Sequence, residues 1–377
     1  MDKPTLTVYF PNWNIRSDSR QDVGNLPWDR IGCVSHAFWK VLPRDGVFTV
    51  VSTDSRADTG PGNPAAHFPK YAACADRYPD KQILLSIGGW TDSGHFSEMA
   101  LTAESRGSFI RSCLEVLDAY PFLSGLDIDW EYPGVARSPQ SEKDEGNPVA
   151  GDDRTNYTLL LKELREALDG HFGAGGKVLT VCAGASVGHA LRMQDYAALH
   201  PYVDRINLMT YDLAGPWEKR TGHHTALRGG NSAETAVNYL LGLGVPPGKI
   251  AVGCPLYSHA WKMNKEEAEP VGAAGTPAGG LSWHDLLPLE QAAAEAGVPG
   301  WHKGYDDEKK AAWLWNDDPG SPDYLTFHTY ESAESLQAKL DYIHEKGLGG
   351  LIVWEVHGDS MENGWPMITE MHRGLDP

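Results

Sequence analysis

Residues 124–133 read SGLDIDWEYP, and the order of acidic and apolar side chains in this segment indicates the architecture of the protein. Because side chains alternate between the two faces of a β-strand, Asp127, Asp129 and Glu131 share one face and the apolar residues beside them share the other. A strand with one apolar and one acidic face fits a closed parallel barrel, whose outer surface meets helices while its inner surface can carry polar groups. Acids near the carboxyl end of such a strand indicate a site for chemistry.

Similar short apolar runs recur along the chain, with helical patterns between many of them. The predicted strands are residues 6–13, 33–41, 82–90, 125–133, 178–185, 205–212, 249–258 and 349–356. The predicted helices are residues 65–78, 104–120, 153–171, 192–200, 231–244 and 332–346. Alternating strands and helices predict an α/β protein with a parallel sheet, here a (β/α)₈ TIM barrel. A doubly wound open sheet is the alternative, but no GxGxxG fingerprint follows the first strand.

Two of these helices have end signals. Asn231 would begin the 231–244 helix, with Glu234 three residues later in a capping-box spacing. Gly347 directly follows the 332–346 helix, where glycine commonly ends a helix.

One long spacing interrupts the alternation. Residues 259–325 separate the seventh strand from the last helix and are too many for a bare loop. They hold strand and helix patterns of their own, so we expect a small inserted α+β subdomain on the carboxyl face of the barrel. The barrel would then comprise residues 1–258 and 326–377. The subdomain would wall one side of a cleft.

Composition and charge exclude several classes of partner. The chain has 377 residues and a formal net charge of −19, which disfavours phosphate backbones and anionic membranes. No apolar run is long enough to span a membrane. A neutral or cationic polymer suits this surface. The five cysteines are odd in number and form no CxxC, so we expect buried, reduced thiols.

The sequence leaves localisation open. No signal peptide precedes the first strand, which is under way by Leu6. Either the protein acts in the cytoplasm where it is made, or the sequence starts at the mature end of an extracellular protein. We expect a monomer.

The three acids of the fourth strand indicate acid–base chemistry. Burial and mutual repulsion oppose ionising all of them, so they must share protons as a coupled unit. Glu131, nearest the end of the strand, is the natural general acid. Ordinary glycosidases need a second carboxylate across the sugar, whereas these acids lie on one side, as in the substrate-assisted exception. A solvated edge strand and a carboxylate metal site are the alternatives. No histidine lies in the motif, and we expect neither metal nor cofactor.

The sequence resembles the chitinases of glycoside hydrolase family 18. The family pattern DxxDxDxE is matched at Asp127, Asp129 and Glu131, although its first aspartate is Ser124 here. Further blocks resemble the family in order along essentially the whole chain. They are SIGGW (86–90), NYTLLLKELREAL (156–168), LMTYD (208–212), GVPPGKIAVGCPLY (244–257) and KGLGGLIVWE (346–355).

The resemblance implies roles for individual residues. Glu131 would be the proton donor, Asp129 would orient the substrate's acetamido group, and Asp127 would share the proton of Asp129. Tyr211 would hydrogen-bond the attacking acetamido oxygen. The other implied contacts are Asp212 with the sugar, Trp354 as the floor of the site, Tyr9 and Ser86 beneath the acids, Met209 beside them, and Tyr257 with the substrate. His259 stands where the family usually has arginine, and is either a polar contact with the sugar or Asp212, or a plain loop residue.

Tryptophans supply the remaining candidates, because apolar sugar faces stack on aromatic rings. Trp39, Trp90, Trp217 and Trp354 lie at or just past strand ends, so we place them in the cleft, and Trp13 is similar. We expect packing roles for Trp28, Trp130 and Trp365. The adjacent pair His223 and His224 is expected to lie in a solvated loop.

The expected function is therefore a retaining, substrate-assisted chitinase acting on chitin or chitooligosaccharides. Two rivals share the barrel: a chitin-binding lectin without catalysis, and an endo-β-N-acetylglucosaminidase acting on N-glycans. Lectins with this fold typically lack the glutamate that donates the proton, whereas Glu131 is present here. A barrel unrelated to sugars would need phosphate-binding loops, and the sequence has none that we recognise.

Overall fold

The computed structural model describes residues 3–14, 22–60, 62–267, 269–293 and 299–376. Its centre is a closed parallel barrel with strand order β1-β14-β8-β7-β6-β5-β4-β2, closed by pairing of β1 with β2. The strands are β1 (Thr5–Pro11), β2 (Cys33–Arg44), β4 (Gln82–Gly88), β5 (Gly125–Asp129), β6 (Val178–Gly184), β7 (Arg205–Met209), β8 (Ile250–Pro255) and β14 (Gly350–Trp354). All eight predicted strands are confirmed, and the open-sheet alternative is excluded.

One strand of this sheet was not predicted. β3 (Val47–Ser52) pairs antiparallel with the extended end of β2 as a hairpin. Asp45 and Gly46, both with positive φ, form the turn between them.

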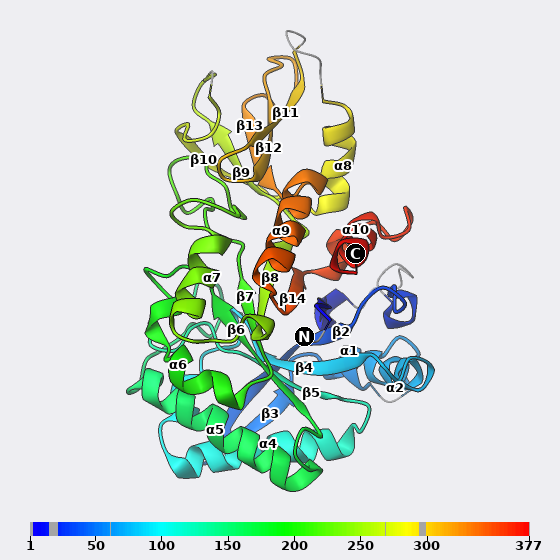
Figure 1. Cartoon of the computed structure of the whole chain (residues 1–377), viewed down its shortest axis with the longest axis vertical. Coiled ribbons are helices and arrows are strands. Elements are labelled where there is room, and N and C mark those ends of the chain that lie inside the picture. The colour runs from blue at the N-terminus through cyan, green and yellow to red at the C-terminus, as the bar shows by residue number, and fades with distance from the viewer. Residues whose placement is uncertain (1–2, 15–21, 61, 268, 294–298, 377) are drawn as a thin grey trace.

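Helices surround the barrel (Figure 1). They are α1 (Ser55–Asp58), α2 (His67–Arg77), α3 (Phe96–Ala100), α4 (Ala103–Ala119), α5 (Asp153–Phe172), α6 (Tyr196–Leu199), α7 (Ala233–Gly242), α9 (Ala333–Lys346) and α10 (Pro366–Leu375). Five of the six predicted helices are confirmed. The sixth, residues 192–200, is not one continuous helix. It consists of the short 3₁₀ helix η4 (Leu191–Met193), then α6, then the 3₁₀ helix η5 (His200–Tyr202). The Asp195 side chain caps α6 by accepting a hydrogen bond from the Ala198 amide.

The two predicted helix ends differ in outcome. The prediction of Asn231 as a cap is wrong, because the Ser232 hydroxyl accepts from the Thr235 amide at the start of α7. Asn231 instead donates to the Leu213 carbonyl. Gly347 does end α9 in the left-handed conformation, with φ of 63°.

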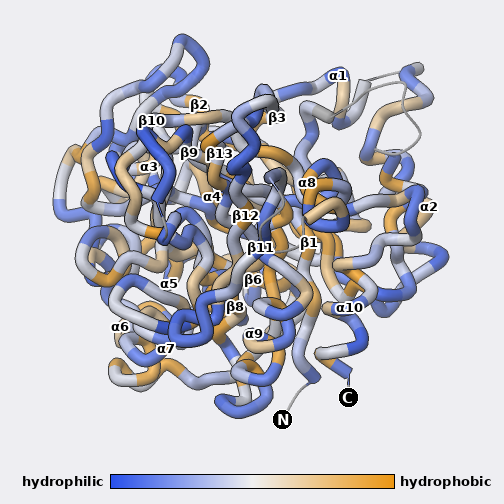
Figure 2. The backbone as a smooth tube through the Cα atoms, turned by 90° about the horizontal axis from the view of Figure 1, so that it is seen from above, coloured by the Kyte–Doolittle hydropathy of each residue, from blue (hydrophilic) through white to orange (hydrophobic). Residues whose placement is uncertain are grey.

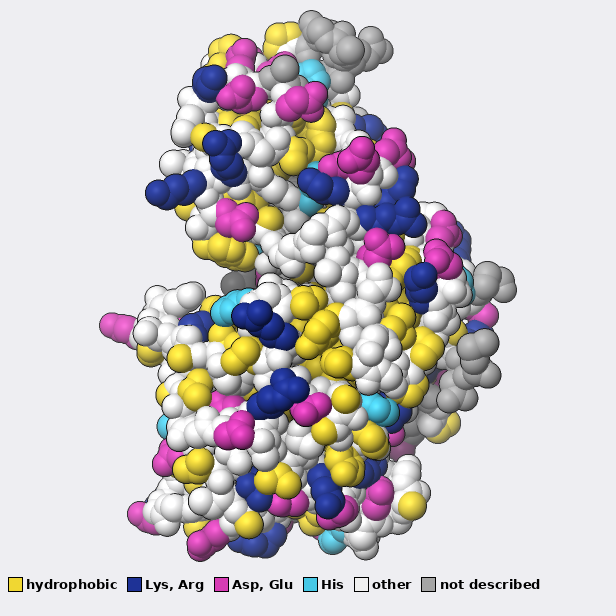
Figure 3. All heavy atoms as spheres, turned by 60° about the vertical axis from the view of Figure 1, so that its left-hand side comes forward, with side chains coloured by type: hydrophobic (Ala, Val, Ile, Leu, Met, Phe, Trp, Pro, Cys, Tyr) yellow, Lys and Arg dark blue, Asp and Glu magenta, His cyan; other side chains and the backbone are white. Residues whose placement is uncertain are grey.

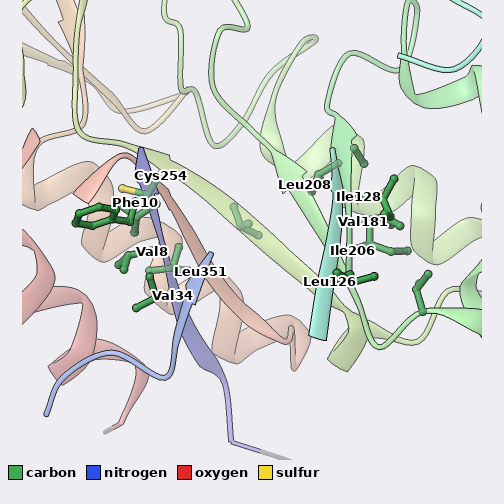
Figure 4. Close-up of a cluster of buried hydrophobic side chains, with 14 of the residues drawn as sticks. Val8, Phe10, Val34, Leu126, Ile128, Val181, Ile206, Leu208, Cys254 and Leu351 are labelled. Atoms are coloured by element: carbon green, nitrogen blue, oxygen red, sulfur yellow. The ribbon is translucent and has the colours of Figure 1, made fainter. Parts of the chain in front are cut away.

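The main core lies between the barrel and its helices. Val8, Val34, Leu126, Ile128 and Leu351 are fully buried there, and their side chains leave the outer face of the strands (Figure 4). The hydropathy view shows hydrophobic stretches gathered inside and the most hydrophilic ones in peripheral loops (Figure 2). The apolar side chains that the sequence predicts on the outer face of this strand therefore do lie on the outer face of β5. Trp28, Trp130 and Trp365 are buried as predicted.

A second sheet stands on the carboxyl face of the barrel and forms the upper lobe in Figure 1. Its antiparallel order is β10-β9-β13-β12-β11. The elements are β9 (His259–Met263), β10 (Gly275–Ala278), α8 (Trp283–Gln291), β11 (Trp301–Asp306), β12 (Ala311–Asn316) and β13 (Thr326–Tyr330). The inserted α+β unit is thus present, and β13, which begins just after residue 325, belongs to its sheet. At the end of β13, Glu331 forms a buried ion pair with Lys339 of α9, which ties this sheet to the barrel.

Two expectations from composition can be checked on the described residues. Their helices include none that is both long and apolar enough to cross a membrane. All five cysteines are buried and free, as predicted.

Candidate active site

The floor of the site is the carboxylate of Asp127, which is completely buried inside the barrel. Strand register places Ser86 on one side of it and Thr180 on the other. Its oxygens accept hydrogen bonds from side chains of five strands. The donors are Ser86 (2.7 Å), Tyr9 (2.9 Å), Thr180 (2.5 Å), Asn207 (3.1 Å) and, more weakly, Ser35 (3.5 Å) and Cys182 (3.5 Å). A buried carboxylate with this many donors is well satisfied.

Asp129, at the end of β5, has a different environment. It is also buried, but its Oδ1 has no hydrogen-bond partner among the described residues. Burial, followed by the nearby charges of Glu131 and Asp127, raises the pKa of Asp129 well above its ordinary value. Burial and the neighbouring negative charges therefore favour the protonated form of Asp129.

Glu131 lies just beyond the strand, at the mouth of the barrel. Burial, with a further contribution from the charge of Asp212, raises the pKa of Glu131 to about 7. From Asp127 through Asp129 to Glu131 the environment thus changes from a floor where the carboxylate accepts many hydrogen bonds to a mouth where burial raises the pKa. A carboxylic acid with a pKa near 7 is suited to protonating a leaving oxygen.

Aromatic and sulfur side chains line the space around these acids. Tyr9, Met209 and Tyr211 belong to one apolar cluster, against which Tyr257 and Trp354 pack. The Trp354 ring lies 5.8 Å from that of Tyr9, and the Tyr211 ring lies 6.3 Å from that of Tyr257. The charges of Asp129 and Glu131 both contribute to raising the pKa of Tyr211, after burial, so its hydroxyl stays protonated beside them. Tyr211 thus lies within electrostatic reach of these acids, and its predicted contact with the acetamido oxygen stays a prediction.

Asp212 follows Tyr211 on the same loop and has a left-handed φ of 55°. Tyr257 donates to its Oδ1 at 2.6 Å, and His259 Nε2 lies 2.6 Å from the same oxygen. Burial raises the pKa of this carboxyl, but the nearby imidazoles of His224 and His259 outweigh it and hold the pKa well below its ordinary value. His259 therefore contacts Asp212, and the plain-loop alternative for His259 is wrong.

Three exposed tryptophans surround the mouth. Trp13 is 53% exposed, Trp217 63% and Trp90 40%, which is rare for this side chain. Trp13 packs near Trp354, and Trp217 packs against His259. The Arg137 guanidinium lies 3.9 Å from the centre of the Trp90 ring and pairs with Asp144, so the loop after β5 supports Trp90. The space-filling view shows the surface hollowed between the upper lobe and the barrel (Figure 3).

The placement of Trp39 in the cleft is wrong. Its side chain is only 5% exposed, donates to Asp58 at 2.7 Å and stacks on Phe68 of α2, outside the barrel. A register shift between His36 and Trp39 interrupts the alternation of β2, so Phe38 turns inward instead and stacks on Trp354. A bulge of this kind has no clear signal in the sequence.

The expectation of a solvated loop for His223 and His224 is also wrong. Both side chains are buried, and they face different partners. His223 Nε2 lies 3.2 Å from Asp306 at the end of β11, whereas His224 lies beside Asp212. The loop after β7 is covered by the second sheet, which sequence spacing did not reveal.

Two further residues of the floor, Cys182 and Asn207, were not predicted from the sequence. Cys182 lies 3.0 Å from the Tyr9 hydroxyl, and Asn207 donates to both Tyr9 and Asp127. Extending the inside–outside alternation from β5 to β6 and β7 would have found both. Ser124, which replaces the first aspartate of the family pattern, accepts a hydrogen bond from the Ile83 amide and so supports the backbone.

Two groups of described residues have ligand atoms close enough to hold a metal ion. One is His36, Asp58 and His67, in the core beneath α2. The other is Asp212, His224 and His259, at the mouth of the barrel. The acids of β5 belong to neither group, and the expectation of catalysis without metal or cofactor stays a prediction.

A TIM barrel with clustered carboxylates at the carboxyl end of one strand, beneath a rim of exposed aromatic rings, has the architecture of a glycoside hydrolase. The profile of glycosyl hydrolases family 18 matches residues 5–359. The chain belongs to this family.

Individual relatives agree with the assignment. The chain is 35% identical to Chitinase A1 of Niallia circulans over 303 residues, which are 74% of this chain and 41% of that protein. It is 30% identical to Endochitinase 1 of Metarhizium anisopliae, covering 93% of this chain and 81% of that protein. The crystal structure of the Ostrinia furnacalis Group IV chitinase superposes with a TM-score of 0.83 at 25% identity, covering all of both chains. The chain thus spans less than half the length of Chitinase A1.

Proposed function

We propose that this chain hydrolyses the β-1,4 linkages of chitin or chitooligosaccharides, with Glu131 as proton donor and retention of configuration at the anomeric carbon. The observation that carries the proposal is the gradient of environment along β5. Asp127 accepts hydrogen bonds from many donors, and Asp129 is buried with one oxygen that has no partner in the described part of the chain. The pKa of Glu131 is raised to about 7. The relatives at 30% identity or more are named chitinases, which supports chitin as the substrate class.

In the proposed reaction the sugar's acetamido oxygen attacks its own anomeric carbon, and Glu131 gives its proton to the departing glycosidic oxygen. The protonated Asp129 and the Tyr211 hydroxyl hold the acetamido group in place for this attack. The apolar surroundings of Tyr211, with the Trp354 ring beneath the sugar, exclude water from the developing oxazolinium ring. Glu131, now ionised, then takes a proton from the water that opens the ring. The overall result is hydrolysis with net retention.

The test is turnover of chitooligosaccharides of three to six sugars, with the anomeric form of the new reducing end read by NMR. Glu131→Gln should lower kcat by about 1,000-fold while leaving oligosaccharide binding in place, because a positioned general acid contributes roughly 10²–10⁴. Glu142→Gln is a matched control, since Glu142 is exposed on the loop after β5. Its activity should equal that of the wild type.

Three results would count against the proposal. Binding of oligosaccharides without product from the wild-type protein would favour the lectin. Cleavage of a high-mannose glycoprotein but not of chitotriose would favour the endo-β-N-acetylglucosaminidase. An inverted product would contradict the substrate-assisted mechanism.

A further inference from the structure

Two His–Asp–His groups among the described residues have the same residue types but different surroundings. In the core group, Asp58 Oδ1 lies 2.8 Å from His36 Nε2. Its Oδ2 accepts from Trp39, Ser52 and, at 3.3 Å, from Asn12. All of Asp58 is buried, and both oxygens are already used. His67 Nδ1, 4.0 Å from Asp58 Oδ1, has no hydrogen-bond partner among the described residues, but an ion bound here would have to displace donors that already occupy both oxygens of Asp58.

The group at the barrel mouth is geometrically open. His259 Nε2 lies 2.6 Å and His224 Nδ1 lies 3.9 Å from the same oxygen of Asp212, and one atom from each residue lies within 4.8 Å of the others. Around a tetrahedral zinc ion with bonds of about 2.1 Å, ligand atoms are roughly 3.4 Å apart. The observed separations bracket this value, so small side-chain rotations place all three ligands on one ion.

His224 supplies an independent sign of a ligand. Its side chain is completely buried, yet neither ring nitrogen has a hydrogen-bond partner among the residues that the structure describes. Buried imidazole nitrogens are ordinarily paired, so each exception needs an explanation. The ring lies against Asp212 on one side and 5.0 Å from the His259 ring on another, and it is therefore positioned to complete a set of ligands.

We propose that Asp212, His224 and His259 bind one divalent transition-metal ion of the zinc type, and that this ion inhibits the enzyme. Two imidazoles and one carboxylate form a donor set that suits zinc, copper or nickel better than magnesium or calcium. Three protein ligands leave a fourth position for water. The Asp212 side chain is 46% exposed and that of His259 18%, so an ion can enter from the cleft.

The ion would replace the direct contact between His259 and Asp212. Because a carboxylate oxygen has two lone-pair directions, Tyr257 can keep its hydrogen bond to Oδ1 while the ion takes the other. A metal-bound Asp212 is no longer free to contact a sugar. Metal binding itself does not depend on the proposed function, whereas inhibition rests on it.

The experiment is a calorimetric titration of Zn²⁺ into EDTA-treated protein, repeated with Co²⁺ to record the visible absorption of a tetrahedral site. The wild type should bind one ion per chain. His259→Ala and Asp212→Asn should each weaken binding by about 100-fold, since loss of a ligand costs at least as much as loss of an outer partner. His171→Ala is the matched control, because His171 pairs with Asp118 away from this site and should bind as the wild type does.

The second measurement is hydrolysis of a chitooligosaccharide at increasing Zn²⁺. Wild-type and His171→Ala enzymes should be inhibited at the concentration that saturates the calorimetric site, and the residual activity of His259→Ala should be resistant. Absence of zinc binding by the wild type, or equal binding by His259→Ala, would overturn the metal site. Zinc binding by a protein without hydrolytic activity would leave the site standing and refute the proposed function instead.

Discussion

The floor and the mouth of the barrel satisfy their polar groups in opposite ways. At the floor, Asp127 is surrounded by donors from neighbouring strands. At the mouth, an oxygen of Asp129 and both nitrogens of His224 lack hydrogen-bond partners among the described residues. Unpaired buried groups are costly, so a ligand that forms hydrogen bonds or coordination bonds with these atoms at the mouth would be stabilised by them. We therefore expect substitutions at the floor to lower mainly stability and substitutions at the mouth to lower mainly activity.

Asp129→Asn should produce the largest effect at the mouth. The amide has the shape of the protonated acid but cannot share a proton with its neighbours, so kcat should fall by about 100- to 1,000-fold. The free energy of unfolding should stay constant or rise, because one ionisable group leaves a buried acidic cluster. Steady-state kinetics and thermal unfolding test both statements. A loss of stability without a loss of turnover would show that Asp129, like Asp127, serves mainly to stabilise the fold.

Asp127→Asn should give the complementary result at the floor. Its amide hydrogens would face existing donors such as Asn207 and Ser86, so we expect a loss of about 3 kcal/mol in the free energy of unfolding. Urea unfolding measures this loss. Asp118→Asn, at an exposed ion pair, should cost less than about 0.5 kcal/mol. Equal losses of unfolding free energy in Asp127→Asn and Asp118→Asn would contradict a stabilising role for the floor.

The pH profile should report the raised pKa of Glu131. Because the general acid must carry its proton, kcat/KM should fall tenfold per pH unit above about pH 7. A profile that stays flat to pH 9 would show that another group is the acid.

Stability should depend on pH through the same group. The folded pKa of Glu131 is about 7 and its ordinary value is 4.5, so its contribution is fully present below pH 4.5 and is lost as pH rises to 7. The unfolding free energy of the wild type, measured relative to Glu131→Gln, should therefore fall across that window. A rise across the window would mean that the pKa is lowered by folding.

Trp217→Ala should give the smallest effect, because the ring lies on the outer rim. We expect KM for long chitooligosaccharides to rise about three- to tenfold with little change in kcat, which corresponds to one lost stacking contact. Trp217→Phe should recover part of the affinity. Trp39→Phe is the contrasting variant: it removes the hydrogen bond to Asp58 and should lower the melting temperature without changing KM. A change of KM in Trp39→Phe would indicate that Trp39 takes part in substrate binding.

The sequence alone determined the barrel, the strand that carries the acids and the family. These follow from local features: the alternation of side chains on a strand, the alternation of strands with helices, and motifs that lie within one element. The order of Asp127, Asp129 and Glu131 along β5 is a local fact of this kind. The raised pKa values at the mouth and the paired carboxylate at the floor depend on contacts with the neighbouring strands.

Tertiary structure decided what depends on contacts between distant segments. The bulge in β2 exchanged Trp39 for Phe38 at the site, and the second sheet buried His223 and His224, which the sequence places in a polar, glycine-rich loop. The donors to Asp127 come from strands up to 118 residues away in the chain. Pairing register and burial arise only when such segments meet, because a residue's neighbours in space are set by the whole chain and not by its own stretch of sequence.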